Sequence, residues 1–214
     1  STGNFMLAGA KKKGVYRSTN FGQTWNKLTT NLPSMNLGRI AVAIAPSSTS
    51  RAYVQIGNSS TDRGIGLYKT TNSGDGWTNV TPPSPPNANG DTIYFLKQES
   101  YNNVLAVHPT NPDIVWSGGV LLWRTTNACN SWTDVGASID KPRPVHVDVH
   151  VLFYRNENVL VVGSDGGIFV TSDEGETWNS ALNQLLPITQ FYNIAVEATD
   201  GNVRFGGTQD NGVI

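Results

Sequence analysis

Four segments of this chain repeat one pattern, in which a short apolar strand runs into a polar turn that ends at a tryptophan. We call these segments box turns. They are Gly14–Trp25, Gly66–Trp77, Leu121–Trp132 and Gly167–Trp178. Their tryptophans lie 52, 55 and 46 residues apart. A repeat of this length predicts that the chain folds as a series of similar supersecondary units.

Two more strand-like runs precede the second, third and fourth box turns, and a further pair follows the fourth. The first runs are Ile40–Ile44, Val104–Val107, Val149–Phe153 and Tyr192–Val196, and the second runs are Ala52–Ile56, Ile114–Trp116, Val159–Val162 and Val203–Phe205. Short β-branched and aromatic runs between Gly, Pro and Asn turns are typical of strands. With the box turn between a third and a fourth strand, each unit reads as a four-stranded β-propeller blade.

The sequence therefore predicts an all-β fold of about four blades with a partial fifth. The expected units are residues 1–35, 36–90, 91–143 and 144–186, with the next blade starting at 187–214. Residues Asn4–Ala8 read as the second strand of a blade, so the two ends do not close a four-bladed ring. We expect an arc of a larger propeller, completed by further blades or by another chain, because open sheet faces and edges are normally covered.

The box turns have a mechanical explanation. A Ser or Thr and an Asn or Asp two residues later can bond backbone N–H groups of the hairpin, glycine permits a positive φ, and tryptophan buries a large ring. The residues at these positions are Ser18, Asn20, Gly22 and Trp25; Thr70, Asn72, Gly74 and Trp77; Thr125, Asn127 and Trp132; and Thr171, Asp173, Gly175 and Trp178. Cys129 replaces the glycine in the third segment, as a tolerated substitution or a reactive thiol.

Charge and hydropathy exclude some kinds of partner. The net charge is −1, so there is no overall basic footprint for nucleic acid, and Lys11–Lys13 is the one basic run, read as a solvated turn. No apolar stretch approaches the roughly 20 residues that cross a bilayer, so direct membrane insertion is not expected.

The most specific polar pattern is His146-x-Asp148-x-His150. If these residues form a strand, all three side chains point to one face and could bind zinc or another divalent metal. Asp165 and Asp210, each beside a turn, could add oxygen ligands. The alternative is that these groups bond neighbouring strands and backbone amides. A divalent metal is therefore a candidate ligand of this chain, and no cofactor is expected to be required.

Loops at the rim of a propeller suit recognition of a protein or glycan. The variable, proline-rich segment Thr81–Gly90 is expected at that rim, and Tyr94, Phe95, Tyr101 and Trp123 could add aromatic contact surface or belong to the core.

The box turns resemble the Asp-box, or bacterial-neuraminidase-repeat, pattern S-x-D-x-G-x-T-W. The fourth segment keeps Asp173, Gly175 and Thr177 together, whereas the first has Asn20 in place of Asp. This resemblance implies the propeller architecture and leaves function open, since sialidases, xyloglucanases, sortilin-type receptors and photosystem assembly factors share it.

The second half is similar to sortilin-like secreted bacterial propellers. The similarity lies in His108–Val115, Gly163–Gly167, Ile188–Tyr192 and Gly206–Gly212. It implies a secreted or cell-surface protein of the kind that often carries a type IX secretion sorting domain in Bacteroidetes.

Three functions remain open at this point. The first is a non-catalytic exported segment that binds protein or glycan, or serves as a scaffold, at a bacterial surface. The second is part of a glycoside hydrolase with its catalytic residues outside this segment, because no arginine cluster or matching catalytic segment is found here. The third is a structural accessory subunit of an envelope complex. An enzyme is the less favoured reading.

Overall fold

A computed structural model describes residues 4–82, 98–135, 144–186, 189–197 and 203–212. These residues form antiparallel sheets, which we number as blades in chain order. Blade 1 contains β1 (Met6–Ala10), β2 (Gly14–Ser18) and β3 (Asn26–Leu28), and blade 2 contains β4 (Leu37–Ile44), β5 (Ala52–Asn58), β6 (Gly64–Thr70) and β7 (Thr78–Asn79). Blade 3 contains β8 (Val104–Val107), β9 (Val115–Gly118), β10 (Leu122–Thr125) and β11 (Thr133–Asp134).

Blade 4 contains β12 (Val149–Asn156), β13 (Val159–Ser164) and β14 (Gly167–Thr171). A single bridge between Val170 and Asn179 stands where the other full blades have a fourth strand. The 3-10 helix η2 (Ala181–Leu185) follows, and the hairpin of β15 (Phe191–Val196) and β16 (Arg204–Thr208) comes last. The fold is thus all-β, as predicted, and each sheet lies within one expected unit, although where one unit ends and the next begins stays a prediction.

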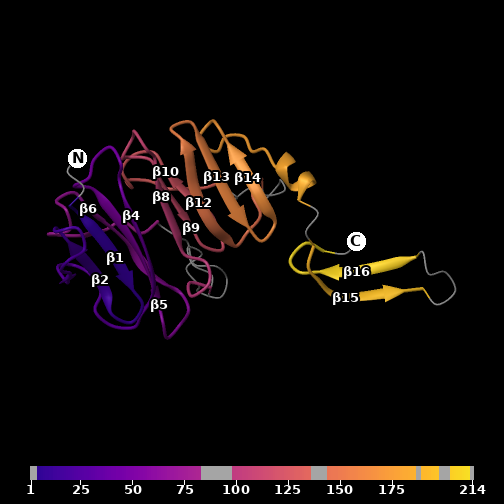
Figure 1. The fold of residues 1–214 in the computed structure, drawn as a ribbon, viewed down its shortest axis with the longest axis horizontal. Helices are drawn as coiled ribbons and strands as arrows, with labels where there is room; N and C mark the ends of the chain where they lie inside the picture. The colour runs from indigo at the N-terminus through magenta and orange to yellow at the C-terminus, as the bar shows by residue number, and fades with distance from the viewer. Residues whose placement is uncertain (1–3, 83–97, 136–143, 187–188, 198–202, 213–214) are drawn as a thin grey trace.

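Blades 1 to 4 stand side by side and form an arc (Figure 1). Within each blade, successive strands pair with their neighbours in chain order. The strands expected at Val104–Val107 and Val149–Phe153 lie in β8 and β12, which are the first strands of their blades. β1 pairs with β2 in the place that β5 holds beside β6, so it corresponds to the second strand of a blade.

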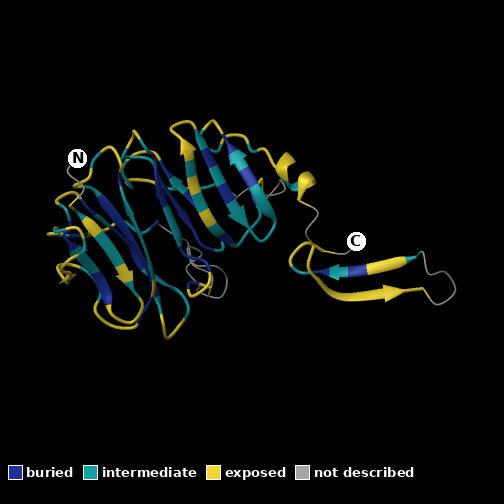
Figure 2. Ribbon diagram, viewed as in Figure 1, coloured by how far each residue is buried: buried dark blue, intermediate teal, exposed yellow. Residues whose placement is uncertain are grey.

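The core lies between the blades (Figure 2). Three apolar clusters fill the three spaces between consecutive blades. Tyr53 and Leu67 of blade 2 pack with Trp123 of blade 3 in one cluster, while Trp116 of blade 3 packs with Leu160 of blade 4 in the next. Because each sheet is covered on a face by its neighbour, removal of apolar surface from water holds the blades together.

The four box turns share one set of hydrogen bonds. In the first, Ser18 Oγ accepts from the Gly22 N–H at 2.8 Å, and Asn20 Oδ1 accepts from the Thr24 N–H at 2.9 Å. The other three box turns have the same two bonds, each from a backbone N–H to a side-chain oxygen. In the second turn they are Gly74 to Thr70 and Gly76 to Asn72, in the third Cys129 to Thr125 and Ser131 to Asn127, and in the fourth Gly175 to Thr171 and Thr177 to Asp173. These bonds satisfy turn N–H groups that no strand can pair.

Each box turn has two consecutive residues with positive φ. The first is never glycine: Phe21, Ser73, Ala128 and Glu174 have φ of 56–58°. The second is glycine in three turns and Cys129, with φ of 71°, in the third. Burial raises the pKa of the Cys129 thiol to about 12, which keeps it protonated and unreactive at neutral pH.

Three of the box-turn tryptophans pack against the preceding blade. Trp77 is 3% exposed and lies in the cluster with Val15 of blade 1, and Trp178 meets Trp116 of blade 3 edge to face at 6.0 Å between ring centroids. Trp132 Nε1 donates to Val80 O of blade 2. Trp25 differs, because it is 39% exposed. The expectation that these rings are buried is therefore confirmed for Trp77, met only in part by the half-buried Trp132 and Trp178, and wrong for Trp25, which has no described blade before it.

A cation on the third strand of one blade reaches the box turn of the next. Arg17 pairs with Asp75 at 2.5 Å, and Arg124 pairs with Glu176 at 3.1 Å. Lys69, at the same position of blade 2, donates to Ala128 O. The equivalent residue of blade 4 is Val170, so this contact ends there.

The β15–β16 hairpin stands apart from blade 4 in Figure 1. Every residue of β15 is exposed. Val151 and Phe153 of β12 are exposed as well, on the open side of blade 4. The hairpin meets the rest of the molecule through the loop that follows β16, described below.

Among the described residues, the model contains no helix with the length and apolar character needed to span a membrane.

Candidate functional site

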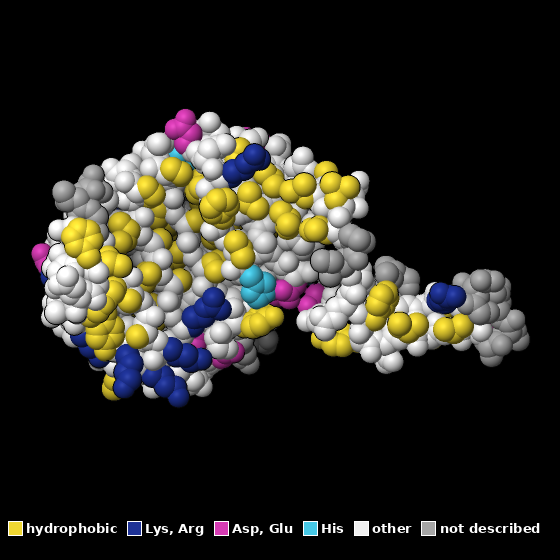
Figure 3. Space-filling view, viewed as in Figure 1, with side chains coloured by type: hydrophobic (Ala, Val, Ile, Leu, Met, Phe, Trp, Pro, Cys, Tyr) yellow, Lys and Arg dark blue, Asp and Glu magenta, His cyan; other side chains and the backbone are white. Residues whose placement is uncertain are grey.

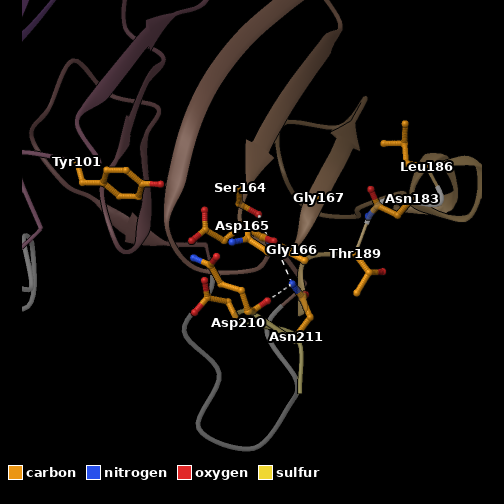
Figure 4. Close-up of a pocket in the computed structure, with 12 residues that line it drawn as sticks. Tyr101, Ser164, Asp165, Gly166, Gly167, Asn183, Leu186, Thr189, Asp210 and Asn211 are labelled. Carbon is orange, nitrogen blue, oxygen red and sulfur yellow. Dashed lines mark hydrogen bonds between the residues drawn. The ribbon is translucent and has the colours of Figure 1, made fainter. Parts of the chain in front are cut away.

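A pocket of about 610 Å³ lies where the β13–β14 turn of blade 4 meets the loop after β16 (Figure 4). Most of the side chains that line it are polar, and Tyr101 and Leu186 are the large apolar ones. The lining residues are Tyr101, Ser164, Asp165, Gly166, Gly167, Asn183, Leu186, Thr189, Gln190, Gln209, Asp210 and Asn211. Carboxylates, amides and hydroxyls thus converge with one aromatic ring, as in sites that orient a polar ligand.

Asp165 lies at the turn between β13 and β14, at the centre of this lining. Its Oδ1 lies 2.7 Å from His150 Nε2, within hydrogen-bond distance. The ring of Tyr101 meets the His150 ring edge to face, with centroids 4.7 Å apart. This contact holds Tyr101, which is 57% exposed, beside the pocket. His150 therefore holds both the Asp165 carboxylate and the exposed Tyr101 ring at the pocket.

The loop after β16 forms the opposite wall. Asp210 O accepts a hydrogen bond from His146 Nε2 at 3.1 Å, and Asn211 Nδ2 donates to Asp165 O at 3.2 Å. The Gln209 N–H donates to Gln190 O at 2.9 Å. The hairpin loop is therefore joined to the blade 4 region by the side chains of His146 and Asn211, each of which donates to a backbone oxygen across the pocket.

A third carboxyl group, that of Asp148, lies behind this wall. Burial raises its pKa, and the charges of Asp165 and Asp210 raise it further, while a hydrogen bond from Asn102 at 2.6 Å and the nearby His146 lower it. Three carboxyl groups thus lie close enough to affect one another, and the two that line the pocket, Asp165 and Asp210, can accept hydrogen bonds from hydroxyl groups of a ligand.

The metal hypothesis finds no support in the geometry. His146, Asp148 and His150 do not share a strand face, because β12 begins at Val149 and Asp148 has a φ of 64°. In the described part of the chain, no three His, Cys, Asp or Glu side chains gather closely enough to hold a metal ion. His146 contacts the backbone oxygens of Val147 and Asp210, and His150 contacts Asp165, so the alternative interpretation describes these residues better.

The sequence indicated some of the pocket residues and missed others. Asp165 and Asp210, the possible additional oxygen ligands in the sequence, and Tyr101, a possible aromatic contact, all line the pocket. Trp123, the other aromatic candidate described here, is buried in the core. Asn183 of η2 carried no signal, although its Oδ1 accepts from the Ile168 N–H at 2.7 Å. Tyr94, Phe95 and most of Thr81–Gly90 lie outside the described residues.

The amino-acid sequence is 25% identical over 194 residues to a protein of Neosartorya fischeri that is named "probable oligoxyloglucan-reducing end-specific xyloglucanase". That match covers 82% of this chain and 23% of the xyloglucanase. No protein-family model matches the chain.

Solved β-propeller structures share the fold. A GH74 enzyme of Niastella koreensis has a TM-score of 0.61 at 16% identity, covering 98% of this chain and 32% of the enzyme. An ancestral GH74 enzyme has a TM-score of 0.55 at 19% identity over 96% of this chain and 26% of its own length. The extracellular domain of BT4673 from B. thetaiotaomicron has a TM-score of 0.55 at 17% identity, and the match covers the whole of this chain and 26% of that domain. The chain is therefore a β-propeller segment that spans a third or less of these relatives.

Proposed function

We propose that this chain is the glycan-binding segment of an exported β-propeller protein and that the glycan binds in the pocket beside Asp165. The observation that carries the proposal is the convergence of the Asp165 carboxylate, the Asn211 and Gln209 amides and the exposed Tyr101 ring on one pocket of about 610 Å³. Sugars present hydroxyl groups that pair with carboxylates and amides, and apolar ring faces that pack on aromatic side chains.

Binding measurements on the whole chain test this proposal. A glycan array that includes xyloglucan oligosaccharides identifies a bound sugar, and calorimetry then compares variants. Asp165→Asn and Tyr101→Ala should each weaken binding about tenfold or more, because a charged acceptor or a contact surface is lost. Glu157→Gln removes an exposed carboxylate from the β12–β13 turn, at the far end of blade 4, and should leave affinity unchanged. Equal affinity in all variants, or no bound sugar, would contradict the proposal.

A second candidate is a part of a glycoside hydrolase. The 25% identity to the xyloglucanase favours it. Glycosidases need two carboxyl groups about 5–10 Å apart across the scissile bond. In this candidate, further blades supply at least one of them. Incubation of any bound oligosaccharide with the longer protein, followed by an assay for new reducing ends, separates a hydrolase from a binding protein.

We also propose that further blades, from the same protein or another chain, complete the ring. The exposed ring of Trp25 supports this, since the same ring in blades 2 to 4 packs against a preceding blade. At the other end of the arc, Val151 and Phe153 of blade 4 are exposed, and a further blade packed against them would remove these apolar side chains from water. Export to a bacterial surface, and a type IX route in particular, belongs to the same proposal. Fractionation of cells that express the full-length protein tests the location.

A further inference from the structure

The turn between β1 and β2 presents three consecutive lysines to solvent. Lys11, Lys12 and Lys13 are all exposed. Lys12 has a φ of 63°, and its N–H donates to Leu37 O at the start of β4 at 3.0 Å. The backbone of the turn is therefore fixed against blade 2, whereas its ammonium groups project into water. No ion pair joins these lysines to a carboxylate in the described residues.

This turn lies on the same rim of the propeller as the pocket. It joins the second and third strands of blade 1, as the turn that carries Asp165 joins those of blade 4. The β1–β2 turn is bonded to the first strand of blade 2 through Lys12 N–H to Leu37 O, and the β9–β10 turn of blade 3 is bonded in a similar way to the start of blade 4 through Asp148 N–H to Val120 O. Figure 3 shows Lys and Arg side chains gathered along the lower edge, with His and acidic side chains beside them where the hairpin joins.

Arg39 and Glu99 lie between the lysines and the pocket, and hydrogen bonds join Glu99 to Arg39 and Arg39 to Tyr101. Glu99 is 1% exposed, and its Oε2 accepts from the Arg39 N–H at 3.0 Å. Lys11 and Arg39 both lie close enough to lower the pKa of Glu99, although burial raises it overall. Arg39 Nη1 in turn donates to Tyr101 O at 2.5 Å, and Tyr101 lines the pocket. We call Lys11, Lys12, Lys13 and Arg39 the basic patch, and it ends at the edge of the pocket.

The charges of the rim thus change sign along its length. The pocket end carries Asp165 and Asp210, which accept hydrogen bonds from hydroxyl groups. The other end carries the exposed cations of the basic patch, of which only Arg39 and Lys11 lie near the buried Glu99 carboxyl. A neutral sugar chain long enough to pass Tyr101 would leave these cations without a partner. A chain with carboxylate or sulfate groups would meet them with opposite charge.

We propose that the ligand of this rim is an acidic oligosaccharide, with one sugar unit in the pocket and its anionic groups over the basic patch. The proposal rests on the glycan-binding function proposed above and names its ligand class. Each exposed cation is expected to strengthen binding about 1.4- to 5-fold at low salt, which is the range of exposed ion pairs. Because these contacts are solvated, their effect must decline as salt is added.

The experiment uses calorimetry at low and high salt with matched ligands. Oligogalacturonate and chondroitin sulfate oligosaccharides are compared with their carboxyl-reduced or desulfated counterparts of equal length. The expected result is an acidic ligand that binds about tenfold more tightly than its neutral counterpart at low salt, with the difference shrinking at high salt. The triple variant Lys11→Gln, Lys12→Asn, Lys13→Gln should remove most of this difference without changing affinity for the neutral counterpart. Asparagine is chosen at position 12 because it tolerates a positive φ.

Arg155→Gln is the control, since Arg155 is exposed at the opposite end of blade 4 and should change nothing. Equal affinity for acidic and neutral counterparts, or an unchanged preference in the triple variant, overturns the acidic ligand and leaves glycan binding intact. If oligosaccharides of neither kind bind, the glycan-binding function itself fails. A third arm uses a single-stranded thymidine oligomer of equal charge. If it binds as tightly as the sugar and Asp165→Asn has no effect on either ligand, the patch is a general polyanion surface and the proposal is wrong.

Discussion

The Glu99 carboxyl group occupies the space beside Gly57, where a Cβ atom would lie 1.4 Å from its Oε2 atom. Gly38 on the adjacent strand leaves the same side chain equally little room, with 2.0 Å to Oε1. Two glycines of blade 2 therefore form a slot for one buried carboxyl group, and the segment that carries Glu99 also carries Tyr101. This arrangement links the packing of blade 2 to the pocket at blade 4.

Gly57→Ala should expel Glu99 from this slot. We expect a loss of about 1–3 kcal/mol in the free energy of unfolding, as for other overpacked interiors, together with weaker glycan binding as Tyr101 shifts. Urea denaturation measures the first effect. Gly76→Ala in the same blade is the control, because its Cβ would meet nothing closer than Asn72 Nδ2 at 3.7 Å. Equal losses in the two variants would show that the slot is not tightly filled.

Glu99→Gln should alter the dependence of stability on pH. Burial raises the pKa of Glu99, so the folded state binds this proton more tightly than the unfolded state does. The contribution of this group to stability therefore rises as pH falls through the raised pKa towards the ordinary glutamate value, and it is least favourable at neutral pH. The glutamine variant should lose that part of the change in stability when melting is followed from pH 7 to about pH 4. The exposed Glu157→Gln variant should keep it.

Asp173→Asn tests the fourth box turn. Hydrogen bonds from the Thr177 side chain and backbone and from Thr171 lower the pKa of Asp173 to about 2. A depressed pKa contributes stability above the ordinary value of roughly 4, and this contribution is lost as pH falls from there towards 2. We expect the asparagine variant to lack this acid dependence in a pH series of denaturation curves.

At neutral pH the same variant should fold normally, because Asn20 already makes the equivalent bonds in the first box turn, with its Nδ2 donating to Thr24 Oγ1 at 2.8 Å. Asp173→Ala removes both kinds of bond and should destabilise the turn at every pH. If the asparagine variant were as unstable as the alanine variant at pH 7, the charge rather than the geometry would hold the turn.

Trp77→Ala and Trp25→Ala should differ in cost although they occupy the same position in the repeat. Trp77 is buried against blade 1, so its truncation should lower the free energy of unfolding by about 3–5 kcal/mol. Trp25 is 39% exposed, so its truncation should lower the free energy of unfolding of this chain by clearly less. If a preceding blade completes the ring as proposed above, it would cover Trp25, and in that longer protein the two costs should become similar. A persistent difference there would argue against a blade in front of Trp25.

Much of the fold follows from local patterns that the sequence displays directly. The runs at Val104–Val107 and Val159–Val162 are strands because β-branched residues between turn residues suit an extended backbone, and they lie in β8 and β13. The positive φ of the residue before each box glycine could not be predicted from the sequence, because this conformation is imposed by the turn as a whole. The condition for a shared face of His146, Asp148 and His150 is not met, because β12 begins only at Val149 and contacts of Asp148 with Val120 and Asn102 set the backbone before it.

The sequence by itself determined the repeat, the strands and the residues that bond within each box turn, because these depend on neighbours a few positions apart. The pocket was decided by the tertiary structure alone. Tyr101 precedes β8, Asp165 lies in the β13–β14 turn and Asp210 follows β16, so these residues lie far apart along the chain. They meet at one pocket because contacts between different sheets, such as Tyr101 with His150 and Asn211 with Asp165, bring their segments together. The burial of a box-turn tryptophan was decided in the same way. Trp25 and Trp77 have the same local pattern, but a described blade lies in front of only one of them.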